Sequence, residues 1–510
     1  MKSLITTDRH RVSSTSHNSL IATSQSDRSR VIYSASFRRL QQKAQVFSLE
    51  SNSSVRSRLT HSIEVSHIGR YIVSRIIQLI EDSQPDFDDE VKKFWRENSL
   101  TISNIVETAC LMHDIGNPPF GHFGEAAIVD WANSNELEEA LKSSLRETSF
   151  DTNELSDELL QDFKNFDGNP QGFRIVAKTQ GDDGYNGLNL TYTQLTALLK
   201  YPYDAESRDI NQDKPFTKKV GFFRTEKKVI HDAWRALNMP ANSRHPLSFL
   251  MEASDDISYC LSDIEDGIEK NVITFEQFKE SLEPLLSELI GDDNDKKKCE
   301  TLIEKLNDNK HSPISPFLAF KTELQNLLVA YVAKAFIERY ESFCNLETDS
   351  DIISGDSVEN RILGGLKRFA RQYLFSSNEA ESIELSGYAI ISGVLEEYQR
   401  LLKLSKDEFL IVLNNDFKEV AEKKLHVHRR LFKKLPEKHL HSYKAAILDR
   451  GILPAEKSSE VDKEVSTKLA TICPKQEWIL RAHLIVDFVS GMTDQFSMEF
   501  FQSIKGIKVG

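Results

Sequence analysis

The spacing of apolar residues is the feature of this sequence that most restricts its fold. In the segment 61–80, HSIEVSHIGRYIVSRIIQLI, apolar side chains recur at intervals of three and four residues rather than at every second residue. Gly and Pro, which interrupt helices, number only 21 and 14 in 510 residues. We therefore expect an all-α, mainly helical fold.

The length of the chain bears on its domain organisation. A chain of 510 residues is longer than one ordinary compact core, so insertions or fused subdomains are expected. We predict a mobile polar arm at 1–25, a motif-rich catalytic core at 26–270 and a helical elaboration at 271–510. Two stretches without a clear motif, 145–160 and 291–316, are interpreted as variable insertions that could regulate activity.

Composition excludes several classes of protein. The five cysteines are scattered and never form a CxxC pair, which argues against a disulfide framework or a thiolate zinc site. No stretch approaches the roughly 18 consecutive apolar residues of a membrane span, so we expect a cytoplasmic protein without a membrane partner. A net charge of −14 argues against a surface devoted to nucleic acid. The basic clusters 36–43 and 426–434 could still bind a nucleic-acid backbone or a triphosphate, although such clusters are more often solvated helix faces.

His61 is the first candidate metal ligand. It shares a helical stripe with Val65 and Ile68, so its ring is expected to point toward the interior. His67 lies off that stripe and is interpreted as structural or exposed. Taken alone, an inward His is more often a hydrogen-bonded core residue than a ligand.

A second candidate site lies where an apolar helical run ends. The run closes at His113 and Asp114, and the following Gly-Asn-Pro-Pro at 116–119 cannot continue a regular helix. Adjacent residues can converge on one ion where the backbone unwinds, and an imidazole with a carboxylate suits a divalent metal. The HD dipeptide is common by itself, but an inward His upstream and an immediate helix break strengthen the signal.

His122 and Glu125 follow the break. They are spaced i and i+3 in the first turn of the next predicted helix, so one can transfer a proton while the other orients it. The alternative is a solvated, capping first turn. Their position beside the candidate metal ligands favours catalysis.

An acidic stripe in the segment 246–270 completes the candidate site. Glu252, Asp255, Tyr259, Asp263 and Asp266 form one helical face, which from pattern alone is most often a water-facing surface. A remote Asp would complete a ligand set of two His and two Asp, and Asp255 is our candidate. The adjacent Asp256 points about a quarter-turn away and is assigned a supporting role.

The order of these candidates resembles the HD superfamily of phosphohydrolases. The narrower resemblance, which covers residues 26–496, is to the long form of the bacterial dGTP triphosphohydrolases. It is carried by six ordered blocks: SDRSRVIYSASFRRLQQKAQVF, RLTHSIEV, LMHDIGNPPFGHFGE, FDGNPQGFRIV, MEASDDISY and VSGMTDQF. Ala44 and Ser254 depart from the residues usual in that family, but both are small and leave the candidate ligands intact.

The resemblance implies a metal-dependent triphosphohydrolase. The reaction would convert dGTP, and other dNTPs as an open alternative, with water into a deoxynucleoside and tripolyphosphate by attack at the α-phosphorus. One divalent ion (Mn, Mg, Fe or Co) would be held by His61, His113, Asp114 and Asp255. In-line attack also requires an oriented water and help for the departing 5′-oxygen, which the resemblance gives to Glu125 and to His122 as general acid.

The resemblance also implies substrate-binding residues and partners. The positions matched to phosphate and sugar contacts are Gln45, Asn169, Lys200, Tyr201, Lys219, Tyr259 and Asp263. The positions matched to base contacts, partly across a subunit contact, are Phe375, Glu384 and Arg430. A homo-oligomer, a hexamer by resemblance, and single-stranded DNA as an effector by analogy are the implied partners.

Two other classes of function compete with this interpretation. One is another HD phosphodiesterase or nucleotidase, which the block around 116–122 and the basic phosphate candidates disfavour. The other is a catalytically idle nucleotide sensor or single-stranded DNA-binding protein. Its hallmark would be a broken ligand set, and none of the four candidate ligand positions is substituted.

Overall fold

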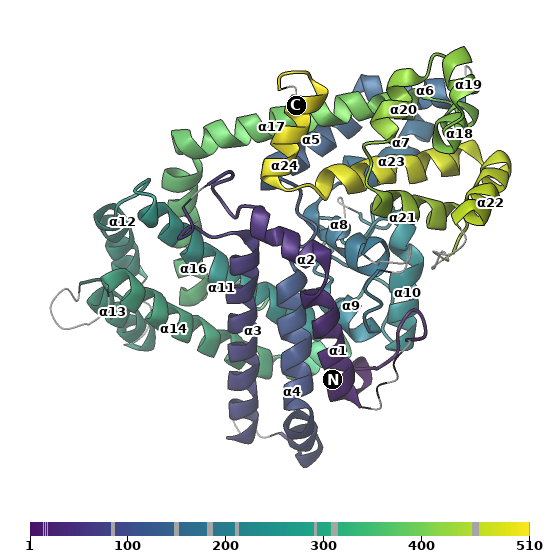
Figure 1. Ribbon diagram of the computed structural model, residues 1–510. Coiled ribbons are helices and arrows are strands. Elements are labelled where there is room, and N and C mark those ends of the chain that lie inside the picture. The colour runs from purple at the N-terminus through teal and green to yellow at the C-terminus, as the bar shows by residue number, and fades with distance from the viewer. Residues whose placement is uncertain are drawn as a thin grey trace.

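Helices of very different length build the protein (Figure 1), and the described residues form no β-strand. The computed structural model describes residues 1–13, 15, 17, 19–50, 52–82, 87–146, 152–180, 187–209, 214–289, 293–307, 315–450 and 458–508. The prediction of an all-α fold is therefore confirmed.

The chain up to the end of the acidic segment forms a succession of helices, with η denoting short 3₁₀ or π segments. In chain order they are η1 (Lys2–Leu4), α1 (Leu20–Ile32), α2 (Ala35–Arg39), η2 (Leu40–Gln42), α3 (Arg58–Glu81), α4 (Asp89–Met112), α5 (Gly121–Ala132), α6 (Asn135–Leu145), α7 (Thr152–Lys164), α8 (Gly168–Arg174), η3 (Ile175–Thr179), α9 (Tyr192–Leu198), η4 (Arg224–Glu226), α10 (Lys227–Ala236) and α11 (Pro246–Glu269).

The remaining elements are again helical. They are α12 (Phe275–Glu288), α13 (Asp293–Asn307), α14 (Pro316–Glu338), α15 (Tyr340–Asn345), α16 (Val358–Phe369), η5 (Ala370–Phe375), α17 (Asn378–Lys403), α18 (Lys406–Asn414), α19 (Phe417–Glu422), α20 (His426–Phe432), α21 (Glu437–Ile447), α22 (Ser458–Thr471), α23 (Pro474–Ser490) and α24 (Asp494–Ile504).

The centre of the fold is formed by α3, α4 and α11, which pack on one another. Val65 and Ile68 on α3 are buried in their interface, as the apolar stripe predicts, and His67 is exposed. Small side chains bring the three helices close, because a Cβ added at Gly69 would lie 2.9 Å from Cys110 Sγ and 3.3 Å from Ser254 Oγ. The helices that carry the candidate ligands are therefore held in direct contact.

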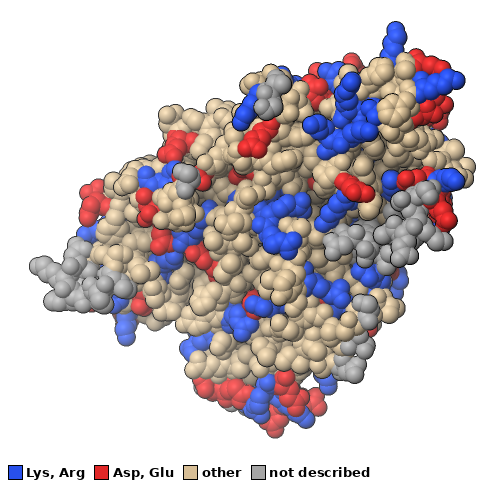
Figure 2. Space-filling model, in the orientation of Figure 1, with Lys and Arg blue, Asp and Glu red and all other residues tan. Residues whose placement is uncertain are grey.

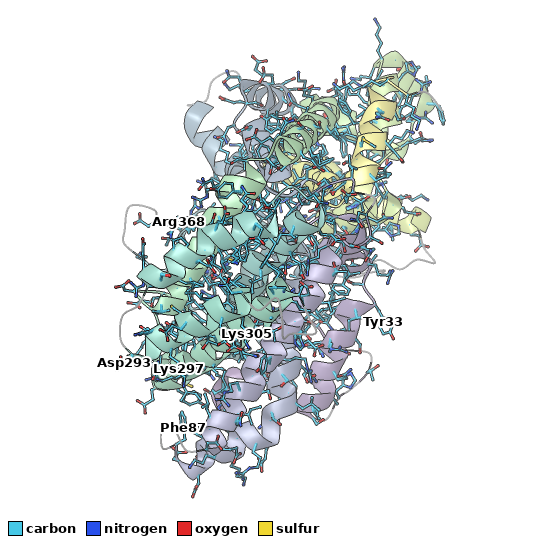
Figure 3. The ribbon with its side chains drawn as sticks, turned by 90° about the vertical axis from the view of Figure 1, so that its left-hand side faces the viewer. Tyr33, Phe87, Asp293, Lys297, Lys305 and Arg368 are labelled. Atoms are coloured by element: carbon cyan, nitrogen blue, oxygen red, sulfur yellow. The ribbon has the colours of Figure 1, made fainter. Side chains whose placement is uncertain are left out.

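Two outer groups of helices flank this centre. In Figure 1, α12, α13 and α14 lie on one side of α3, and α17, α23 and α24 cross the end of the molecule near α5. Figure 3, turned by 90°, places Asp293 and Lys297 of α13 at the edge opposite to Tyr33, which follows α1. Because α14 packs on α3 and α17 packs on α5, helices from both sides of residue 270 share cores. The domain division at 270 stays a prediction.

The segment 1–25, predicted to be a mobile arm, makes several contacts with the rest of the fold in its described part. Met1 and Leu4 are buried, and the carbonyl of Leu4 accepts a hydrogen bond from His245 Nε2 at 2.9 Å. Arg9 and Asp27 form a buried ion pair with a distance of 2.5 Å. The polar composition suggested an exposed arm, but these polar groups find partners within the fold.

Two further expectations concern the stretches without a clear motif and the lack of a membrane span. The stretches 145–160 and 291–316 fall partly outside the described residues, and their role stays a prediction. Among the residues that the structure describes, no helix combines the length and the apolar character needed to cross a membrane.

Candidate active site

The four candidate ligands meet where α3, the end of α4 and α11 come together. His61 Nε2 lies 3.3 Å from Asp255 Oδ1, and His113 Nε2 lies 3.5 Å from the same oxygen. His113 Nε2 also lies 3.6 Å from Asp114 Oδ1. One ligand atom each from His61, His113 and Asp114 can be chosen so that all lie within 4.8 Å of one another. The structure thus brings together all four residues named from the sequence.

The donor set fits a divalent cation. His113 Nδ1 donates to the carbonyl of Cys110 at 2.7 Å, which leaves the lone pair of Nε2 facing the cluster. His61 is almost fully buried, and its Nε2 faces the same point. Two imidazoles and two carboxylates suit Mn, Fe, Co or Mg ions. The residues present could therefore hold one such ion.

Arg58 and Asn117 fix the carboxylate of Asp114. Arg58 Nη1 donates to Asp114 Oδ2 at 2.7 Å, and Asn117 Nδ2 donates to Oδ1 at 2.7 Å. Burial raises the pKa of Asp114, but His113 and Arg58 outweigh burial and hold this pKa well below its ordinary value. Sequence reasoning missed both supporting residues. Arg58 lies three residues before His61 on the same helix face, which was an available signal.

His122 and Glu125 form a hydrogen-bonded pair at the start of α5. His122 Nδ1 donates to Glu125 Oε2 at 2.8 Å, and Glu125 Oε1 accepts from the Gly168 amide at 2.8 Å. The His122 side chain is 84% exposed and that of Glu125 only 12%, so His122 Nε2 is free to reach a ligand. The hydrogen bond that His122 donates to Glu125 raises the pKa of His122.

The backbone at Gly121 joins this pair to the cluster. Gly121 has a φ of +55°, and a Cβ added there would lie 2.8 Å from Arg58 Nη2. The guanidinium that binds Asp114 therefore abuts the first turn of α5. Arg58 thus lies between the candidate ligand Asp114 and the start of the helix that carries the candidate pair His122 and Glu125.

The candidate phosphate-binding residues surround the same centre. Lys219 forms an ion pair with Asp167, and Asp167 Oδ1 accepts from the Asn169 amide at 2.9 Å. Lys200 Nζ lies 3.0 Å from Glu252 Oε1. Tyr201 is buried. A small cavity is lined by Met112, His113, Asn169, Gly172, Phe173, Leu198, Leu199, Lys200 and Gly221.

Known proteins align with nearly the whole length of the chain. The HD domain family model matches residues 58–179. The deoxyguanosinetriphosphate triphosphohydrolase of Salmonella enteritidis PT4 is 35% identical over 514 residues, which cover 95% of this chain and 94% of that protein. The chain belongs to the deoxyguanosinetriphosphate triphosphohydrolase family.

Other members of this triphosphohydrolase family match over a similar length. The protein of the same name from Enterobacter sp. (strain 638) is 33% identical over 97% of this chain and 96% of its own length. That of Yersinia enterocolitica is 34% identical over 94% of this chain and 93% of its own. The prediction of an HD-superfamily hydrolase from six sequence blocks is thereby confirmed.

In this triphosphohydrolase-family chain, the acidic stripe of α11 is buried. Glu252, Asp263 and Asp266 are all almost inaccessible, so the alternative of a water-facing surface is wrong. Both carboxyl oxygens of Asp263 lack a hydrogen-bond partner within the described residues. Burial, together with Asp266 and Asp255, raises the pKa of Asp263 well above its ordinary value. Burial and the two neighbouring carboxylates thus favour the protonated form of Asp263.

Tyr259 and Phe375 form an aromatic wall near Asp263. Their rings stack with centroids 6.4 Å apart and planes at 21°, and the π segment η5 brings Phe375 to this position. Gln45 Oε1 is a buried acceptor without a hydrogen-bond partner among the described residues. Asp256, assigned a supporting role from the sequence, forms an ion pair with Lys367 at 2.8 Å.

The remaining base-contact candidates lie farther out in this family member. Glu384 on α17 is half-buried, and the charge of His122 acts on its carboxyl group. Arg430 on α20 is exposed, and no interaction within the described part of the chain brings it to the cluster. A role for Arg430 within its own subunit is therefore without support.

Proposed function

We propose that the chain is a metal-dependent triphosphohydrolase that converts dGTP and water into deoxyguanosine and tripolyphosphate, with other dNTPs as further substrates. The observation that carries the proposal is the meeting of His61, His113, Asp114 and Asp255 beside the His122–Glu125 pair. The relatives with this sequence pattern are named for the same activity.

The cofactor we infer is one divalent ion, Mn, Mg, Fe or Co, held by these four residues. When bound, such an ion neutralises charge on the reacting phosphoryl group and polarises its oxygens. Arg58 and Asn117 contribute by holding the Asp114 carboxylate in one orientation. The hydrogen bond between His113 and the Cys110 carbonyl keeps the His113 ring in the tautomer that presents Nε2.

His122 is the general acid in this proposal. A water oxygen bonds to the α-phosphorus, the bond from phosphorus to the 5′-oxygen breaks, and His122 Nε2 gives its proton to that oxygen. Glu125 keeps His122 protonated and oriented through the hydrogen bond to Nδ1. Both oxygens of Glu125 are already engaged, which favours this supporting role over the water-orienting role expected from the sequence.

Binding of the substrate is assigned to groups around the cluster. The phosphates would meet the cations and polar groups of Lys200, Lys219, Tyr201 and Asn169. The Asp263 carboxyl, when protonated, would donate a hydrogen bond, and the carbonyl oxygen of Gln45 would accept one, so both suit a sugar hydroxyl.

The base pocket and the assembly form a second part of the proposal. Phe375 would stack on the guanine beside Tyr259, and Glu384 would accept from its edge. Arg430 would come from another subunit of a homo-oligomer, a hexamer by resemblance. Its exposed position supports a contact between subunits. A cytoplasmic location is consistent with five unpaired cysteines.

Single-stranded DNA is proposed as an effector, bound to a basic surface on α20 and its flanks. Figure 2 shows Lys and Arg side chains gathered over α20, although the chain carries a net charge of −14. This basic surface comprises Lys423, Lys424, Arg429, Arg430, Lys433 and Lys434. Its affinity for DNA should fall as salt is raised.

The test of the activity is a product analysis. Protein supplied with Mn²⁺ or Mg²⁺ is incubated with each of the four dNTPs and with GTP, and the products are separated. Deoxyguanosine with tripolyphosphate from dGTP is the expected result. A nucleoside monophosphate as product would instead indicate another HD phosphohydrolase, and nucleotide binding without turnover would indicate a sensor.

A further inference from the structure

A series of ion pairs lies along the first half of α11, beside the candidate active site. Glu252 is its centre: Oε1 lies 3.0 Å from Lys200 Nζ, and Oε2 lies 2.5 Å from Arg244 Nη2. Arg244 Nη1 in turn lies 3.1 Å from Asp351 Oδ1. The Arg244 and Glu252 side chains are buried, whereas that of Lys200 is partly exposed. The buried pair of Arg244 and Glu252 therefore links Asp351, which is also partly exposed, to a cation that can meet a ligand.

Arg244 holds the Lys200 segment at a second point. Its Nε donates to Ser248 Oγ at 3.0 Å, and Ser248 Oγ donates to the carbonyl of Leu199 at 2.8 Å. The guanidinium also lies 3.9 Å from the centre of the Phe249 ring, which fixes its plane. Arg244 thus reaches the Lys200 segment by two routes: through Glu252 to the Lys200 side chain, and through Ser248 to the Leu199 carbonyl.

Glu252 is well placed to act on Lys200 and badly placed to bind substrate. It lies three residues before Asp255, on the same face of α11, and Lys200 lines one cavity with His113 and Asn169. Burial alone would raise the pKa of Glu252, but Arg244 and Lys200 lower that pKa to about 2. A permanent negative charge would repel phosphate, and both of its oxygens already bind cations.

We propose that Glu252 is a positioning residue, which holds the ammonium of Lys200 at the rim of the cavity so that it meets the triphosphate. This inference rests on the proposed function. A free lysine side chain has many rotamers, and its ordering opposes ligand binding. Lys200 is already ordered by Glu252 before the substrate arrives, so less conformational freedom is lost when the phosphate binds. Glu252 acts only through Lys200.

A double-mutant cycle tests this coupling. The affinity of the Mg²⁺-supplied protein for inorganic tripolyphosphate is measured by calorimetry for wild type, Glu252→Gln, Lys200→Met and the double variant. We expect Glu252→Gln to weaken binding about tenfold, of the size seen when contacting residues are coupled. In the Lys200→Met background, Glu252→Gln should change the affinity little. Equal weakening in both backgrounds, or no weakening in either, would overturn the proposal.

Two further variants separate positioning from general damage. Glu107→Gln is the matched control, since the Glu107 side chain is also 8% exposed and also pairs with two cations, Arg28 and Arg70, away from Lys200. It should leave tripolyphosphate affinity unchanged, and a tenfold loss there would overturn the proposal. If Glu252→Gln does not fold, Glu252→Asp keeps the negative charge opposite Arg244 but shortens the side chain, which withdraws its carboxylate from the Lys200 ammonium, and it should show the same coupling. Because the readout is binding, absence of dGTP hydrolysis by the wild type would refute the proposed function alone.

Discussion

Gly168, the first residue of α8, touches both halves of the candidate active site, and Gly168→Ala is the sharpest test of its geometry. A Cβ at this position would lie 1.8 Å from Asn117 Oδ1 and 3.2 Å from Glu125 Oε1. Asn117 holds Asp114, and Glu125 holds His122. A single added methyl group therefore disturbs a ligand and the catalytic pair together.

The size of the effect follows from these distances. An ordinary contact of a Cβ begins at 3.4 Å, so Asn117 Oδ1 must retreat by about 1.6 Å. A misplacement of about 1 Å can lower a rate by roughly 100-fold. We therefore expect the kcat for dGTP hydrolysis to fall by roughly 100-fold or more. Stability should suffer less, because alanine favours a helix over glycine by roughly 0.5–1 kcal/mol.

Gly364→Ala, within α16 and outside the cavity lining, is the matched control. Its added Cβ would meet only Arg368 Nη1, at 3.8 Å. The assay compares kcat, metal content and the thermal midpoint of both variants with the wild type. Gly364→Ala should resemble the wild type. If Gly168→Ala has the same kcat as Gly364→Ala, the argument that Asn117 and Glu125 set the active geometry is refuted.

The charges at the site lead to three further predictions. Glu125→Gln removes the charged partner that raises the pKa of His122, so His122 loses its proton at a lower pH. The alkaline limb of the kcat/KM profile should therefore move to lower pH. An unmoved limb would contradict the pairing of His122 with Glu125. Asp114→Ala should lose its divalent ion on dialysis, as measured by elemental analysis. His122→Ala should keep the ion, but its kcat should fall by roughly 10²–10⁴-fold. An Asp114→Ala protein that keeps its metal and its activity would refute the ligand assignment. The pKa of Asp263 is raised in the folded protein, so this carboxyl destabilises the fold increasingly as pH rises above the ordinary aspartate pKa. Asp263→Asn should therefore raise the urea midpoint of unfolding near neutral pH and leave it unchanged in acid. Equal midpoints at neutral pH would show that the pKa of Asp263 is not raised.

Sequence reasoning succeeded where the determinant is local. The three- and four-residue apolar spacing of segment 61–80 predicted α3, because helix formation depends on neighbours along the chain. The end of α4 at Met112 and the start of α5 at Gly121 follow from the Gly-Asn-Pro-Pro break, for the same reason. The i, i+3 spacing of His122 and Glu125 predicted that they share the first turn of α5, where they form a hydrogen bond.

Only the tertiary structure decided the contacts between distant segments. The approach of Asp255 to His61 spans 194 residues, and the pairing of Glu252 with Lys200 and Arg244 depends on how α11 packs. An acidic stripe has the same pattern whether it faces water or buried cations, so the pattern alone favoured a surface that the fold buries. Arg9 is a similar case, because in the sequence it looks like a solvated charge and only the fold places Asp27 beside it.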